Sequence, residues 1–549
     1  MITVHAVLAA MALLVGMAVP AFAQDVASAA GGQDRAASGE PVAHDHPAPG
    51  EPAEQVGSRG PDVQATVSNL TRVETWRFFE PPFAGVDPDY TFWSNRSDLE
   101  IRVRGRRVDL DGGFSYVRVE HLPVDAIGPG GLGTGAFYFA ASGQAYSYQV
   151  FLSALTLSVH DERRRRTLAV GRMPYTSGAE GDESLDGDGR GALVGFADSR
   201  ATGGGLAPDG RGAAPGSPMR GAARSDVRRL AIDGRLVGTF GWSMYQRRFD
   251  GARVDWRGDG RYAGGSAFMV SQGGYEESAN LTIDRLQVGT AFAGQRHGVD
   301  AESQVFGVYY RDRRPVDIRP DNSLVPVEAA DITIAAVGAS HVAARGVGPG
   351  LVDYAAWGAW QGGDWYGQSH RAYGVAAQAG YRWPSAPWNP WVRGGASHAS
   401  GDPNGRDDRH ETFFPMLQET RSYAQSMVYA QANLRDLFAQ VLAEPHARVR
   451  TRVDVHRLDL AEVGDRWYQG SGATARDGRF FGYSTRPSNG ARGLGTVLEA
   501  SADVRITRYW SMNGYAGRMW GGPVVRGSFA ADRLFYWYVE NVLRLDLRS

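Results

Sequence analysis

The sequence predicts an all-β protein, a single antiparallel β-barrel that crosses a membrane. Three observations predict it: an N-terminal run typical of exported proteins, alternating apolar and charged residues along most of the chain, and aromatic residues grouped at the ends of the alternating segments. The segment "RVRTRVDVH" at residues 448–456 shows the alternation, because side chains of a strand point alternately to opposite faces. One face consists of Val449, Thr451, Val453 and Val455, and the other of Arg448, Arg450, Arg452, Asp454 and His456.

Such a strand fits either a soluble sheet or the wall of a membrane barrel. The N-terminus favours the barrel, because an apolar run from Ala6 to Ala23 ends in "AFA", a small-residue cleavage pattern. We therefore expect residues 1–23 to be a signal peptide for Sec export, cut before Gln24. No other segment approaches the ~20 consecutive apolar residues of a spanning helix. A membrane crossing would therefore use strands.

Composition narrows the class of function. An exported chain without Cys has no disulfides and depends on a large core or a closed sheet. All 58 basic residues are Arg, which excludes a phosphate-binding loop with its Lys, a Schiff base and a Ser-Lys dyad. The chain also lacks G-x-S-x-G and H-E-x-x-H patterns, and its net charge of −2 does not indicate nucleic acid. We predict a protein that is not an enzyme and needs no cofactor.

Two regions follow the signal peptide. Residues 24–62 are rich in Ala, Gly, Pro and Ser, and we expect a flexible periplasmic leader because they cannot bury enough surface to offset the entropy of ordering. Residues 63–549 consist of alternating segments separated by turn residues and are expected to form the barrel. In the leader, "HDH" at His44–His46 could bind a metal, although a polar linker is the simpler explanation.

The first clear hairpin spans residues 99–120. The apolar face of its first strand consists of Leu99, Ile101 and Val103, and the charged face of Glu100, Arg102 and Arg104. The "DGG" at residues 111–113 is expected to form the turn, with a β-bulge near Arg106 and Arg107 shifting the phase. In the returning strand, Arg118 is expected on the charged face and Val117 and Val119 on the apolar one.

Later segments continue the pattern. Residues 252–256 place Arg253 and Asp255 on the charged face, and residues 498–506 place Glu499, Asp503 and Arg505 there. In the last strand one face consists of Phe535, Trp537, Val539, Leu543, Leu545 and Leu547. Residues 423–442 fit helical and strand spacing about equally well, and we expect two strands with a break near Arg435 and Asp436.

Aromatic pairs mark the expected strand ends, where such rings suit the two lipid–water interfaces. They are Phe78 and Phe79, Phe92 and Trp93, Tyr309 and Tyr310, Tyr509 and Trp510, and Phe535 to Tyr538. Short turns and long polar connections also differ as the two rims of a barrel do, so residues 177–225 and 400–421 are expected to be extracellular loops. Since no linker interrupts residues 63–549, one closed sheet is the simplest arrangement.

Several segments resemble the alginate export family of outer-membrane β-barrel porins. The clearest are "ASGDPNGRDDRHETFFP" at residues 399–415 and "DRWYQGSGATARDG" at residues 465–478. The last strands and the segments around Arg172 and Arg248 are also similar, although Met173 replaces the family's Gln. The resemblance implies a monomeric barrel of about 18 strands in the bacterial outer membrane, through which an acidic polysaccharide leaves the periplasm. It covers most of the chain from Val63.

In such a barrel, luminal guanidinium groups would attract the carboxylates of a uronate polymer and give an anion-selective channel. The expected pore-lining residues are Arg102, Arg104, Arg118, Arg172, Arg253, Arg448, Arg450, Arg452, Asp454, His456 and Arg505. Interspersed acids would prevent any one position from binding too tightly. Each arginine could equally pair with a luminal acid and brace the wall. The expected partners are acidic polysaccharide, outer-membrane lipid and periplasmic export proteins.

Two other functions stay open. A plugged or narrow surface barrel could act as an adhesin or matrix anchor, and an open one could be a general anion-preferring porin for uptake. The stretch "EGDESLDGDGRG", which contains Asp182, Asp186 and Asp188, could bind Ca²⁺ or be a solvated extracellular loop. Single-channel conductance would separate an open pore from a plugged adhesin.

Overall fold

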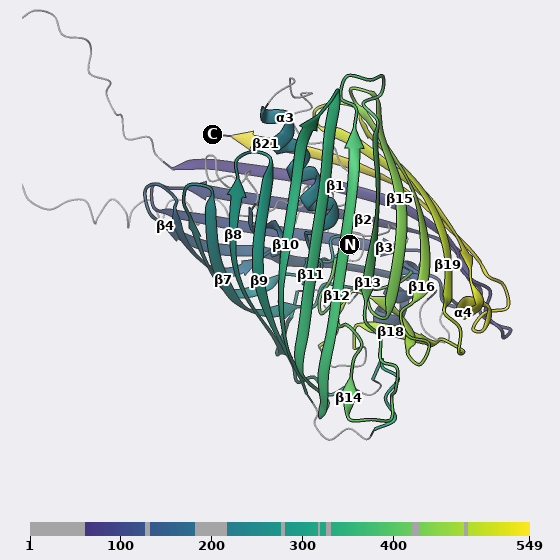
Figure 1. Cartoon of the computed structure of the whole chain (residues 1–549). Helices are drawn as coiled ribbons and strands as arrows, with labels where there is room; N and C mark the ends of the chain where they lie inside the picture. Colours follow the sequence, from purple (N-terminus) through teal and green to yellow (C-terminus); the bar gives the residue numbers. More distant parts are fainter. Residues whose placement is uncertain are drawn as a thin grey trace, which may run out of the picture. The chain divides into compact units, whose positions relative to one another are not determined.

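The computed structural model describes residues 61–126, 132–181, 217–275, 280–316, 319–325, 331–419, 428–476 and 481–548. Within these residues, eighteen strands close into one antiparallel barrel, as predicted, and Figure 1 shows them side by side along its wall. The predicted signal peptide, the leader up to residue 60 and the acidic stretch with Asp182, Asp186 and Asp188 lie outside the described residues.

Each strand of the wall pairs with the next wall strand in the chain, and three short strands in the connections are not part of the wall. Strand β21 pairs with β1, from Gln64 opposite Arg548 to Arg77 opposite Phe535, and closes the ring. The wall strands are β1 (Asp62–Arg77), β2 (Asp89–Arg104), β3 (Val108–Glu120), β4 (Tyr146–His160), β5 (Arg166–Met173), β6 (Phe249–Arg257), β7 (Arg261–Ser271), β8 (Thr282–His297), β9 (Ala301–Asp312), β10 (Ile332–Val347), β11 (Gly350–Trp365), β12 (Gln368–Arg382), β13 (Trp391–Ala399), β15 (Leu434–His446), β16 (Val449–Leu460), β19 (Gly493–Arg505), β20 (Trp510–Gly521) and β21 (Arg533–Arg548).

The remaining elements belong to the connections between wall strands. They are α2 (Thr134–Ser142), the 3₁₀ turn η1 (Ala179–Gly181), α3 (Ser217–Ala231), α4 (Pro523–Arg526), β14 (Arg409–His410), β17 (Arg466–Gly470) and β18 (Tyr483–Pro487). Strand β14 pairs in parallel with β12, and β17 and β18 form a separate two-stranded sheet. None of the helices in the described residues has the length and apolarity to cross a membrane.

The two rims of the barrel differ. At one rim, short turns such as residues 105–107, 298–300 and 447–448 join neighbouring strands, and β1 begins and β21 ends there. The longest connections, residues 174–248 and 400–433, leave from the opposite rim. Short turns lie on the periplasmic side of outer-membrane barrels. We refer to the two ends as the turn rim and the loop rim.

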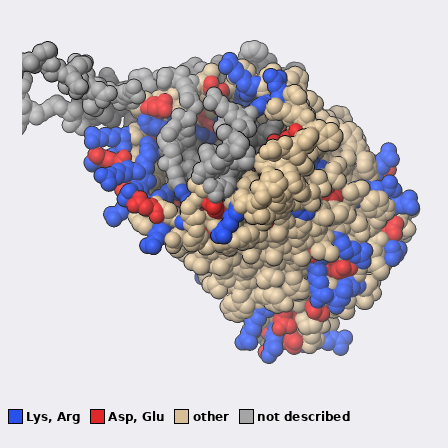
Figure 2. All heavy atoms as spheres, turned by 45° about the horizontal axis from the view of Figure 1, so that its top comes forward, with Lys and Arg blue, Asp and Glu red and all other residues tan. Residues whose placement is uncertain are grey.

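The two faces of the wall differ as the alternation predicts. Val453 and Val455 are 47% and 42% exposed on the outside of β16, whereas Arg452, Asp454 and His456 are 5%, 2% and 1% exposed on the inside. Figure 2 shows the consequence at the surface, where charged side chains gather towards the edges and leave a broad uncharged area between them. An apolar outer band of this kind suits contact with lipid.

The predicted turn of the first hairpin was wrong. Residues 105–107 form the turn between β2 and β3, whereas residues 111–113 lie inside β3 and pair with β2. The phase shift near Arg106 is therefore the turn itself and not a β-bulge. Val117 and Val119 point inward and are fully buried, and Arg118 points outward on the same face as Val108 and Leu110.

A stretch of each long connection folds into the barrel instead of extending outward. Residues 232–248 are almost entirely buried, and so are residues 412–419. The predicted break near Arg435 and Asp436 was also wrong, because β15 runs without interruption from Leu434 through both residues. The pair Phe78 and Phe79, expected at a lipid interface, is buried inside.

Candidate functional site

Residues 232–248, which precede β6, lie in the interior of the barrel, and we call them the inward segment. Trp242 of this segment packs near the β1–β21 seam, where the Arg72 guanidinium lies 3.3 Å from the centroid of its ring. Apolar side chains in the middle of a connection favour burial over solvent. The segment therefore narrows the lumen from within.

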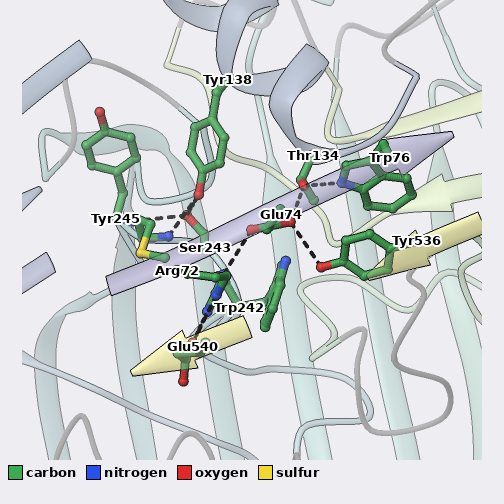
Figure 3. Close-up of polar contacts among 12 residues, drawn as sticks. Arg72, Glu74, Trp76, Thr134, Tyr138, Trp242, Ser243, Tyr245, Tyr536 and Glu540 are labelled. Atoms are coloured by element: carbon green, nitrogen blue, oxygen red, sulfur yellow. Dashed lines mark hydrogen bonds and ion pairs between the residues drawn. The ribbon is translucent and has the colours of Figure 1, made fainter. Parts of the chain in front are cut away.

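Arg72 anchors this segment to the wall, as Figure 3 shows. Its Nε and Nη2 donate to Oε2 of Glu540 at 2.9 and 2.7 Å, and its Nη1 donates to the backbone carbonyl of Trp242 at 3.0 Å. Glu74 next to it accepts from the hydroxyls of Thr134 at 2.8 Å and Tyr536 at 3.0 Å. One ion-pair network thus joins β1, β21, α2 and the inward segment.

Arg247 ties three interior segments together. Its Nη1 donates to the carbonyls of Gly238 at 2.9 Å and Leu417 at 3.1 Å, and its Nη2 donates to the carbonyl of Ser471 at 2.9 Å. Burial lowers the pKa of Arg247 to about 10, so the side chain remains a cation at neutral pH. A guanidinium suits this position because its planar fork can serve several carbonyls at once.

Helix α3 occupies the interior at the turn rim. Ala223 packs against Ala344 of β10 and Leu351 of β11, both of which face inward. Arg224 Nη1 donates to the carbonyl of Val299, in the turn between β8 and β9, at 3.2 Å. A connection that leaves the loop rim therefore reaches the opposite rim through the lumen.

Three buried arginines surround a small cavity between the start of the inward segment and strands β12, β13, β15 and β16. They are Arg235, Arg393 and Arg452, and the cavity has a volume of about 30 Å³. Arg393 Nε donates to Asp353 Oδ1 at 3.2 Å, and Arg452 Nε donates to Asp454. Among the described residues, Arg393 Nη2 and Arg452 Nη1 have no hydrogen-bond partner. Buried unpaired donors are costly, and a small anion or water would satisfy both.

Most of the residues predicted to line the pore lie on the inner face of the wall. The inner wall contains Arg102, Arg104, Arg253, Arg450, Arg452, Asp454 and His456. Arg448 lies in the turn between β15 and β16, and Arg505 ends β19 at the same turn rim. Only Arg452 of these arginines lines the cavity.

Two predicted residues lie elsewhere. Arg118 is exposed on the outer face near the loop rim, where it pairs with Glu120 and lies 5.7 Å from the centroid of the Trp93 ring. Arg172 forms a bidentate ion pair with Asp250, in which the Nε–Oδ1 and Nη2–Oδ2 distances are both 2.6 Å. Gly171 before it has a φ of 128°, so the strand is irregular where Arg172 lies.

Most of the predicted arginines have a carboxylate partner. The closest nitrogen–oxygen distances are 2.9 Å for Arg102–Glu100, 2.6 Å for Arg104–Asp111, 2.7 Å for Arg253–Asp255 and 3.1 Å for Arg450–Glu444. All four pairs neutralise charge, and Arg104–Asp111 and Arg450–Glu444 also join neighbouring strands, as the bracing alternative expects. Contact of these arginines with a substrate stays a prediction.

Sequence reasoning missed Arg235, Arg247 and Arg393. Arg393 lies in "WVRGG", where glycines hide the alternation, and the other two lie in a connection that has no strand period. The available signal was the stretch "TFGWSMY" at residues 239–245, which is too apolar for an exposed loop. It could have indicated a segment folded into the interior.

The chain is similar to several solved structures at low sequence identity. Solved structures similar to this one include OccK5 (OpdH) of Pseudomonas aeruginosa, with a TM-score of 0.49 and 8% identity over 88% of this chain and 98% of that one. A BenF-like porin from Pseudomonas fluorescens Pf-5 has a TM-score of 0.49 and 9% identity over 88% and 99% of the two chains. OccAB3 of Acinetobacter baumannii has a TM-score of 0.48 and 9% identity over the same shares. No curated protein matches the sequence.

The family assignment rests on the sequence itself. A family model described as alginate export matches residues 220–536, more than half of the chain. The match covers most of α3, and it covers the inward segment and the wall strands from β6 to β20 in full. This chain therefore belongs to the alginate export family of outer-membrane β-barrel channels.

Proposed function

We propose that the protein is an outer-membrane channel whose arginine-rich lumen passes an acidic polysaccharide of the uronate type. The observation that supports it most directly is the cavity of Arg235, Arg393 and Arg452, in which two guanidinium nitrogens lack partners among the described residues. A carboxylate oxygen is a strong acceptor for guanidinium donors of this kind. We further propose that the chain is exported by the Sec pathway with loss of residues 1–23 and acts as a monomer.

The acids beside these arginines fit transport better than tight binding. Asp353 and Asp454 each hold one edge of a cavity arginine, so a passing carboxylate competes with a fixed one. Competition of this kind keeps the residence time short, and conduction requires release as well as entry. The interior segments that fill the lumen would have to move aside for a polymer.

The test is anion selectivity and block by oligouronates in planar lipid bilayers, with the purified full chain. Arg393→Gln and Arg452→Gln should each reduce anion selectivity and weaken oligouronate block several-fold, because each removes a donor that faces the cavity. Arg457→Gln is the matched control, since Arg457 lies on the outer face of β16 and is exposed. It should leave both quantities unchanged.

A charge-matched variant separates binding from the general field of the lumen. The double variant R452Q/D454N restores the net charge, so anion selectivity should recover while block by oligouronates stays weak. Full recovery of both would mean that the arginine only contributes charge. Unchanged block in R393Q and R452Q would contradict the proposal.

The plugged surface barrel remains the second candidate, and the inward-folded segments favour it. Residues 232–248 and 412–419 fill the interior of the described barrel. A chain that conducts no current in bilayers but binds polysaccharide at its surface would support the adhesin function over transport.

A further inference from the structure

We propose that Asp454, His456 and Glu499 form a binding site for a divalent transition-metal ion of the zinc type on the inner wall of the barrel. One candidate ligand atom of each residue lies within 4.8 Å of those of the other two. All three side chains are buried, with at most 2% of each residue exposed. One imidazole nitrogen and two carboxylates are a donor set that zinc-type ions accept, with room for a further ligand.

The orientation of the imidazole supports the proposal. Nδ1 of His456 lies 3.0 Å from both carboxylate oxygens of Asp436. Since a carboxylate only accepts, Nδ1 carries the hydrogen and Nε2 can offer a lone pair. Asp436 lies on β15 and Glu499 on β19, the two opposite neighbours of β16. Nε2 is therefore the nitrogen that is left for the cluster.

Hydrogen bonds from neighbouring side chains hold the candidate ligands in place. A carboxylate on the far nitrogen of a ligating His fixes its tautomer and raises its basicity, as Asp436 does here. Glu499 is held in a comparable way, because the hydroxyl of Tyr515 donates to its Oε1 at 2.9 Å. Both contacts would hold a ligand in place before a metal arrives.

Two atoms of the candidate ligands have no hydrogen-bond partner. Among the described residues, Nε2 of His456 and Oδ1 of Asp454 have no hydrogen-bond partner. Burying a polar atom without a partner costs on the order of a hydrogen bond. A metal ion bound by both atoms would remove the cost in one step.

The charges around the cluster also favour a cation. Asp436, Asp454 and Glu499 lie near one imidazole. The neighbouring cations include Arg452, which pairs with the other oxygen of Asp454, and Arg393, whose charge also acts on Asp454 but which pairs with Asp353. A protonated His456 would supply one charge, but its Nε2 hydrogen would then lack an acceptor among the described residues. A divalent cation would balance the charge of the carboxylates. It would also bind Nε2 of His456 and Oδ1 of Asp454, which have no hydrogen-bond partner among the described residues. The site does not depend on the proposed substrate.

The experiment measures metal binding by the full chain in detergent after treatment with EDTA. His44→Gln and His46→Gln are introduced throughout, because the leader could also bind zinc. The chain should take up about one Zn²⁺ after dialysis. X-ray absorption of the zinc-loaded chain should show an imidazole nitrogen among nitrogen and oxygen ligands.

Variants locate the site. His456→Gln and Glu499→Gln should each weaken Zn²⁺ binding at least tenfold, since each removes a ligand. Asp436→Asn should weaken it by about 10- to 100-fold without removing a ligand, as expected of a positioning residue. His398→Gln is the control, because His398 lies on β13 and contacts the ring of Tyr373 away from the cluster.

Two results would overturn the proposal. One is a chain without the leader histidines that takes up no zinc, or a zinc shell without imidazole. The other is a folded H456Q or E499Q chain that binds zinc as tightly as the parent, where folding is judged by the heat-dependent gel mobility of barrels. The first result decides the question even if neither variant folds.

Discussion

Asp402 and Asp465 show what burial does to single side chains at the loop rim. Asp465 accepts from the backbone nitrogen of Asp402 at 2.9 Å, from Thr412 Oγ1 at 2.6 Å and from the hydroxyl of Tyr468 at 2.7 Å. Burial, with a contribution from the charge of Asp465, raises the pKa of Asp402 to about 7. Burial raises the pKa of Asp465 to about 6. Both aspartates lie in segments that resemble the alginate export family.

The folded loop should therefore lose stability as the pH rises. Because the pKa of Asp402 is 3.8 in an ordinary setting and about 7 here, the folded loop binds more protons than the unfolded loop between these values. Each pKa unit corresponds to about 1.4 kcal/mol. Hydrogen–deuterium exchange of residues 400–419 at about pH 5 and about pH 8, corrected for intrinsic rates, should show weaker protection at the higher pH.

Asp402→Asn should flatten this dependence, since an amide does not titrate. Asp408→Asn, at an exposed position of the same loop, should retain the slope of the parent chain. An Asp402→Asn chain whose protection still falls with pH would show that other groups control the loop.

At the level of residues, the sequence predicted positions better than roles. Alternation alone placed Arg450, Arg452, Asp454 and His456 inside the barrel, because a strand has only two faces. It failed at Arg118, which shares the outward face of β3 with Val108, Leu110 and Phe114, because the charge of a residue does not by itself decide its face. Which arginine is paired and which keeps a free nitrogen depends on neighbouring strands, and one strand's sequence does not contain that information.

Among the elements, the inward segment at residues 232–248 depends on one side chain. Arg247 donates to carbonyls of its own segment, of the connection before β15 and of the connection before β18. Arg247→Lys keeps the charge but loses the fork, so docking of these segments should weaken by on the order of 2 kcal/mol.

Hydrogen–deuterium exchange should then become faster in residues 413–419 and 471–476, and single-channel current should increase with more frequent fluctuations. Arg457→Lys on the outer face of β16 is the matched control. Unchanged exchange in R247K would mean that packing alone holds the three segments.

Strands were easier to predict than connections for a physical reason. A wall strand repeats its environment every second residue, whereas a connection has no period and can turn either way at the rim. Residues 400–421 read as polar and were expected outside, yet residues 412–419 are buried. Gln361 Oε1, for example, accepts from the backbone nitrogen of Phe414 at 2.9 Å. Polar composition predicts exposure only where no polar interior is available.

The closure of the whole barrel depends on the pairing of its first and last strands. Arg72 and Glu540 face each other across that seam and are both buried. Glu540→Gln replaces the charged acceptor of two Arg72 hydrogen bonds with a neutral one, while Glu74 still pairs with Arg72 at 3.3 Å. The variant should destabilise the barrel by roughly 2 kcal/mol.

Urea unfolding in detergent, followed by heat-dependent gel mobility, measures this loss. Glu162→Gln, in an exposed turn where Glu162 pairs with Arg106 and Arg107, should leave the midpoint unchanged. Equal midpoints for E540Q and the parent chain would show that main-chain pairing alone closes the barrel.

The path of α3 has a consequence for how the two compartments communicate. The helix belongs to a connection that starts at the loop rim, yet Arg224 holds the turn at residues 298–300 at the far end. A force on this connection at the loop rim and a force on it at the turn rim would act on the same segment of the chain. A change in the width of the barrel at one rim should therefore also act on the other rim.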